Sequence, residues 1–130
     1  MFNRVRARAR RARIALLLLA FAGWQLSPMA LAHAIVVTAS PAAKAELVGP
    51  AVPIDLEFNS RIDASRSRLA VLDSRGQPTP LEIDLSAPAN HLRAIAEDLA
   101  PGNYVLEWYV LSTDGHITRG RLKFSVIHSG

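Results

Sequence analysis

Apolar and polar residues alternate along most of the chain after residue 33, and this pattern predicts β-strands. In "IDLEF", the side chains of Ile54, Leu56 and Phe58 alternate with two acids. Period-two alternation bounded by Pro, Gly, Asn and Ser is typical of half-buried strands, and no window has a convincing helical period. The expected strands cover residues 34–38, 54–58, 68–73, 81–85, 91–96, 101–112 and 120–126.

About seven short strands separated by turn signals predict an all-β fold, a small immunoglobulin-like antiparallel β-sandwich. Residues 39–53, "ASPAAKAELVGPAVP", and 74–80, "SRGQPTP", contain several prolines and are expected to form loops. The best candidates for the core lie on one face of the strand at 101–112, and they are Tyr104, Leu106, Trp108 and Val110.

The first 32 residues have the pattern of a secretory signal peptide. Residues 1–13, "MFNRVRARARRAR", contain six arginines and no acid, and an apolar run, "IALLLLAFAGW", follows at 14–24. Small residues stand at Ala30 and Ala32, as signal peptidase requires. The apolar run is shorter than the roughly 20 residues of a transmembrane helix. We therefore expect a signal peptide at 1–32, export of the protein and a single domain at 33–130, with an uncleaved anchor as the alternative.

The leader also explains the basic composition of the chain. The full sequence has 15 Lys and Arg against 11 Asp and Glu. Six of the arginines lie in the leader, so residues 33–130 keep 9 basic and 11 acidic residues, a net charge of −2. This balance argues against a nucleic-acid-binding protein. The chain has no cysteine, and both methionines, Met1 and Met29, lie in the leader. Disulfides therefore cannot stabilise the domain.

Residues 112–120, "STDGHITRG", lie between two predicted strands and pose a choice. Asp-Gly between alternating strands is a strong hairpin signal, so the segment could be only a turn. Asp114 and His116 are two residues apart, and residues i and i+2 of an extended segment face the same side. The pair could therefore hold a ligand together.

Cleavage after Ala32 would make His33 the first residue, and this favours a metal site. The free amine and Nδ1 of an N-terminal histidine can chelate one metal ion, and the amine has an ordinary pKa of about 8. Nitrogen ligands bind Cu(II) more strongly than other divalent first-row ions. His116 would add a second imidazole and Asp114 an oxygen. His91 and His128 are expected to be exposed and without partners.

The segment "HAIVVTASPAAKAELVGPAVPIDLEF" from residue 33 and the segment "LAPGNYVLEWYVLSTDGHITRGRLKFSV" from residue 99 together resemble the CopC family of periplasmic copper-binding proteins. The resemblance implies a small β-sandwich that binds Cu(II) through His33, Asp114 and His116. It also implies a role beside an inner-membrane copper transporter of the CopD type. Two features depart from some family members: Ser60 stands where a carboxylate is found, and no methionine-rich Cu(I) loop is present. We therefore expect one Cu(II) ion per chain.

These observations predict a periplasmic protein that sequesters or carries Cu(II) in copper homeostasis or resistance and is not an enzyme. The sequence has no phosphate-binding loop and no nucleophile elbow. One alternative is a copper-dependent oxidase with a histidine brace, similar to the polysaccharide monooxygenases. Another alternative is a metal-free immunoglobulin-like adhesion or chaperone module.

Overall fold

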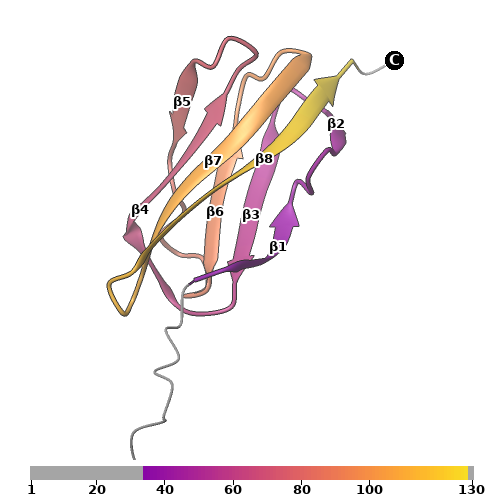
Figure 1. Ribbon diagram of the computed structural model, residues 1–130. Helices are drawn as coiled ribbons and strands as arrows, with labels where there is room; N and C mark the ends of the chain where they lie inside the picture. Colours follow the sequence, from indigo (N-terminus) through magenta and orange to yellow (C-terminus); the bar gives the residue numbers. More distant parts are fainter. Residues whose placement is uncertain (1–33, 129–130) are drawn as a thin grey trace, which may run out of the picture. The chain divides into compact units, whose positions relative to one another are not determined.

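The computed structural model describes residues 34–128, which form eight β-strands and no helix (Figure 1). Across these residues, no helix has the length and apolar character needed to cross a membrane. The strands are β1 (Val36–Ser40), β2 (Glu46–Val48), β3 (Val52–Phe58), β4 (Ile62–Leu72), β5 (Pro78–Leu81), β6 (His91–Ala96), β7 (Gly102–Ser112) and β8 (Ile117–Ile127).

The strands form two sheets, and the apolar core lies between them. One sheet has the order β1-β3-β6 and the other the order β2-β8-β7-β4-β5. All pairs are antiparallel except β2 with β8, which is parallel. This architecture confirms the predicted all-β sandwich. The largest fully buried side chains come from both sheets: Ile54, Leu56, Phe58, Leu69, Val71, Leu92, Leu106 and Val110.

The predicted core face of β7 is confirmed. Leu106 and Val110 are completely buried, while Tyr104 and Trp108 are partly buried and pack against the core cluster. Tyr104 also stacks on Phe124 of β8, with ring centroids 5.6 Å apart. The alternation in the sequence therefore identified the inward face of this strand correctly.

Two short strands differ from the sequence prediction. β5 covers Pro78–Leu81, whereas a strand was expected at 81–85 and a loop before it. β5 pairs only with β4 at the edge of its sheet, and an edge strand tolerates prolines that lack an N–H. β2 lies within the expected loop at 39–53 and pairs with distant β8. Its three residues are too few to show a period.

The expectation that His91 is exposed and without a partner is wrong. Its Nδ1 lies 2.8 Å from Oδ1 of Asp55 on the neighbouring strand β3, and its side chain is 19% exposed. Arg93 Nε donates to Oδ2 of the same carboxylate at 3.0 Å. Burial alone would raise the pKa of Asp55, but the hydrogen bonds from His91 and Arg93 outweigh it and hold that pKa below its ordinary value. Only strand pairing brings these residues together, so local spacing could not reveal the contact. His128 is exposed, as expected.

Gly120 leaves space for the indole of Trp108. The two residues are direct partners across β7 and β8. A Cβ built at Gly120 would lie 2.2 Å from Cζ2 and 2.3 Å from Cε2 of the Trp108 ring. The ring therefore requires glycine at this position of the strand.

We predict that Gly120→Ala lowers the free energy of unfolding by about 1–3 kcal/mol, the usual cost of overpacking. Elsewhere in a strand, alanine in place of glycine is normally stabilising. Urea denaturation would measure the effect. The control is the same substitution in a Trp108→Leu background, where the cost should largely disappear. An equal cost in both backgrounds would show that the indole is not the cause.

Candidate metal centre

A tight turn between β7 and β8 carries both Asp114 and His116. β7 ends at Ser112 and β8 begins at Ile117. The backbone N–H of Ser112 donates to the carbonyl of His116 at 2.9 Å, and the N–H of Gly115 donates to the carbonyl of Ser112 at 2.9 Å. Gly115 has a φ of +90°, a conformation that residues with a Cβ rarely adopt. The hairpin predicted from Asp-Gly is confirmed.

The turn brings the carboxylate of Asp114 against the imidazole of His116. Nδ1 of His116 lies 3.1 Å from Oδ2 of Asp114, and each side chain is 41% exposed. The backbone N–H of His116 donates to Oδ1 of the same carboxylate at 3.1 Å. The two side chains are therefore neighbours, as expected, but a turn brings them together rather than an extended segment.

Ser112 is part of this site and was not identified from the sequence. Its side chain is buried, and its hydroxyl donates to Oδ1 of Asp114 and lies 3.0 Å from the carbonyl oxygen of His116. The hydrogen bond from Ser112, followed by that from the N–H of His116, lowers the pKa of Asp114 from 3.8 to about 2. The carboxylate is therefore ionised throughout the neutral range. A serine two residues before an aspartate is a frequent turn pattern, so the sequence alone gave too weak a signal.

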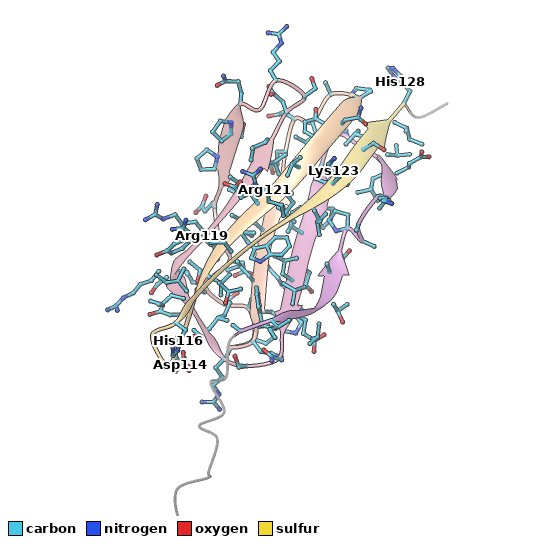
Figure 2. All side chains as sticks on the ribbon, in the orientation of Figure 1. Asp114, His116, Arg119, Arg121, Lys123 and His128 are labelled. Carbon is cyan, nitrogen blue, oxygen red and sulfur yellow. The ribbon has the colours of Figure 1, made fainter. Side chains whose placement is uncertain are left out.

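The loop between β3 and β4 connects this hairpin to the beginning of the described chain. The backbone N–H of Ile35 donates to Oδ1 of Asn59 at 2.8 Å, and the N–H of Asn59 donates to the carbonyl of Ile35 at 2.9 Å. Two residues later, the carbonyl of Arg61 accepts from the N–H of Thr113 in the hairpin at 3.4 Å. Figure 2 shows Asp114 and His116 at one end of the sandwich. The described chain also begins at this end, in indigo in Figure 1.

His33, the third predicted ligand, lies outside the described residues, as does the expected signal peptide at 1–32. Within residues 34–128, no group of three or more His, Cys, Asp or Glu side chains is arranged to hold a metal ion. Ser60 lies in the loop just described. Its buried hydroxyl has no hydrogen-bond partner among residues 34–128. Asp114 and His116 are therefore two donors that need others to complete a metal site.

We predict that Ser112→Ala raises the pKa of Asp114 in the metal-free protein from about 2 toward its ordinary value of 3.8. Because the folded-state pKa is the lower one, Asp114 contributes stability above its unfolded pKa, and this contribution is lost as pH falls through the folded pKa. A carboxyl-carbon NMR titration would measure the shift. Thr113→Ala, in the same turn, is the control and should leave the pKa unchanged. An unchanged value in Ser112→Ala would contradict the role given to this hydroxyl.

The chain is similar to a known protein family and to several of its relatives. Residues 36–127 match the model of the CopC domain. The crystal structure of CopC from Methylosinus trichosporium OB3b superposes with a TM-score of 0.69 and 31% identity, covering 75% of this chain and 97% of that chain. Protein YobA of Escherichia coli K12 is 29% identical over 104 residues, covering 78% of this chain and 84% of YobA. Copper transport protein CutJ of Bacillus subtilis 168 is 27% identical over 98 residues, covering 73% of this chain and 18% of CutJ. The chain belongs to the CopC family.

Proposed function

We propose that the processed chain binds one Cu(II) ion through the amine and Nδ1 of His33, the imidazole of His116 and the carboxylate of Asp114. The observation that carries this proposal is the hairpin itself, because it holds a carboxylate and an imidazole against each other. Copper is the cargo of the protein. The chain sequesters or carries it in copper homeostasis or resistance, as its membership of the CopC family supports.

The hydrogen bonds of the loop between β3 and β4 support the participation of His33. Ile35 is paired with Asn59, and the carbonyl of Arg61 contacts the hairpin. Residue 33 precedes Ile35 by two residues, so the chain cannot carry its Cα more than roughly 7 Å from that of Ile35. Asn59, which pairs with Ile35, and Arg61, which contacts the hairpin, are likewise two residues apart. This short chain distance supports the proposal that the amine of His33 binds copper together with the hairpin.

The donor set suits Cu(II). Nitrogen ligands with a carboxylate oxygen favour this ion among the divalent first-row metals. Asp114 has a pKa of about 2, so no proton needs to leave it when a cation binds at neutral pH. The chain has no methionine after residue 29, so the soft ligands that select Cu(I) are absent from the domain. One ion per chain follows from this single set of ligands.

Signal cleavage has a chemical consequence in this proposal. In the precursor, the nitrogen of His33 is an amide and cannot act as an amine ligand. Removal of residues 1–32 in the periplasm would create the ligand in the compartment where the protein acts. The proposed partner is an inner-membrane transporter of the CopD type, which would exchange copper with this domain. The similarity to the copper transport protein CutJ supports a role in copper transport.

Neither alternative function gains a specific observation from the structure. A histidine-brace oxidase would share the proposed amine and imidazole ligands, and peroxide-driven cleavage of a polysaccharide by the copper-loaded protein would support it. A metal-free adhesion or chaperone module would retain no copper after dialysis.

We predict that one alanine added before His33 weakens Cu(II) binding by at least about 100-fold, because it converts the amine ligand into an amide. Competition titration with a chromogenic copper chelator would measure the affinity of the exported protein, after N-terminal sequencing confirms its first residue. His128→Ala is the control and should not change the affinity. Unchanged binding by the extended chain would refute the proposed N-terminal ligand.

We also predict that His116→Ala weakens Cu(II) binding and changes the electron paramagnetic resonance spectrum, since one nitrogen leaves the coordination sphere. His128→Ala is the control, because this exposed histidine follows the last residue of β8, at the other end of that strand from the hairpin. Its spectrum and affinity should equal those of the unmodified protein. Copper bound through His91 instead would contradict the proposal, because His91 belongs to the three-stranded sheet and not to the β7–β8 hairpin.

A further inference from the structure

The outer face of the five-stranded sheet carries three rows of side chains across β4, β7 and β8. The strand register places Arg68, Tyr109 and Arg119 in the first row. The second row is Ala70, Glu107 and Arg121, and the third is Leu72, Val105 and Lys123. We call this surface the arginine face, defined by Arg68, Glu107, Tyr109, Arg119, Arg121 and Lys123.

Positive charge is concentrated on the arginine face although residues 33–130 have a net charge of −2. Four of its residues are basic, and Glu107 is its one acid. Glu107 forms an ion pair with Arg121 at 2.6 Å. Within residues 34–128, Arg68, Arg119 and Lys123 have no ion-pair partner. Three positive charges on this face are therefore left without a counter-charge from the described part of the chain.

Tyr109 holds two of the arginines in place. The guanidinium carbon of Arg68 lies 5.4 Å from the centroid of the Tyr109 ring, and that of Arg119 lies 5.2 Å from it. Arg68 and Arg119 are its direct neighbours on the strands at either side, β4 and β8. Cation–π contacts of this kind reduce the freedom of long side chains before a ligand binds. The arginines are also among the lining residues of a surface hollow that reaches Pro80 of β5.

We propose that the arginine face is the docking surface for a partner protein whose contacting surface carries carboxylates. Arginine forms paired hydrogen bonds with carboxylates, and three of the four basic residues here are arginines. Tyrosine and arginine are among the residues enriched in the centres of protein interfaces. Attraction to an anionic membrane depends instead on the number of charges, typically a cluster of four to eight Lys or Arg. The face has four basic residues, the lowest number in that range, and Glu107 compensates one of them, so its composition favours a protein.

The position of the arginine face connects it with the hairpin. Along β8, Lys123, Arg121 and Arg119 lead toward the turn that carries Asp114 and His116, as Figure 2 shows. Two residue pairs separate the first arginine row from that turn, Val110 with Thr118 and Leu111 with Ile117, and by strand alternation only the second pair lies on the outer face. A partner docked on this face would lie beside the hairpin. Direct transfer of copper to this partner rests on the proposed function. Docking on the arginine face does not depend on copper binding.

The test compares two double variants of the mature protein with the same change in net charge. Arg68→Glu with Arg119→Glu alters the face. Arg66→Glu with Arg75→Glu is the control, since both of these exposed arginines lie outside the rows. The probe is a fluorescein-labelled peptide of twelve alternating glutamate and alanine residues, titrated by fluorescence anisotropy. Amide shifts in an NMR spectrum locate its binding site.

We expect the peptide to shift amides of β4, β7 and β8, and the face variant to bind it about tenfold more weakly than the control variant. In cells of the native host, a photoreactive phenylalanine at position 123 should give a protein adduct that the face variant loses and the control variant retains. If circular dichroism shows that the face variant is unfolded, Arg68→Gln with Arg119→Gln replaces it, and Arg66→Gln with Arg75→Gln becomes its control.

Equal losses in both variants would overturn the proposal, because binding would then follow net charge alone. Amide shifts confined to other strands would also overturn it. So would binding to phosphatidylglycerol vesicles without binding to the peptide, or self-association of the chain through this face in sedimentation experiments. Copper titration separates the two proposals. The face variant should keep the Cu(II) affinity of the unmodified protein. If the unmodified protein binds the peptide at this face but retains no copper, the docking proposal is supported and the proposed copper function is refuted.

Discussion

The hydrogen bonds of the loop between β3 and β4 are the constraint on which the proposed site depends. On one side of the loop, Asn59 pairs with Ile35 near the beginning of the domain, and on the other side Arg61 contacts Thr113 in the β7–β8 turn. The sandwich therefore ties a segment early in the sequence to a turn about 80 residues later, because non-local strand pairing defines this fold. The proposed participation of His33 in a site with Asp114 and His116 depends on these hydrogen bonds.

The electrostatics of the turn complement this constraint. A buried hydroxyl at Ser112 and the N–H of His116 both donate to one oxygen of Asp114, so the carboxylate stays ionised and fixed in orientation. Its other oxygen faces the imidazole of His116. An outer residue that orients a ligand is as much a part of a metal site as the ligand itself. On the opposite sheet, Asp55 contacts both a histidine and an arginine, and the arginine distinguishes that cluster from the turn.

The sequence predicted the sandwich, the inward face of β7 and the Asp-Gly hairpin, because each depends on local alternation or on the chemistry of a turn. It missed β2, whose three residues pair with a strand far away in the chain, and it misplaced β5, whose prolines look like a loop. It also assigned no partner to His91, because Asp55 lies 36 residues away and only the register of β3 and β6 brings the two together. Ser112 was missed for a different reason, since burial of a hydroxyl cannot be read from residue type. His33 remains a prediction, because it lies outside the described residues.

The net charge of the domain does not reveal how its charged residues are distributed over the surface. Six of the arginines lie in residues 1–13, yet the domain also gathers arginines on one outer face, and that face leads to the turn of Asp114 and His116. The central claim concerns the turn. A crystal structure of the processed, Cu(II)-loaded protein tests it most directly. The account predicts one copper ion bound by the terminal amine and ring of His33 together with the side chains of Asp114 and His116. Copper bound at Asp55 and His91, or at His128 with His33 turned away, would contradict it.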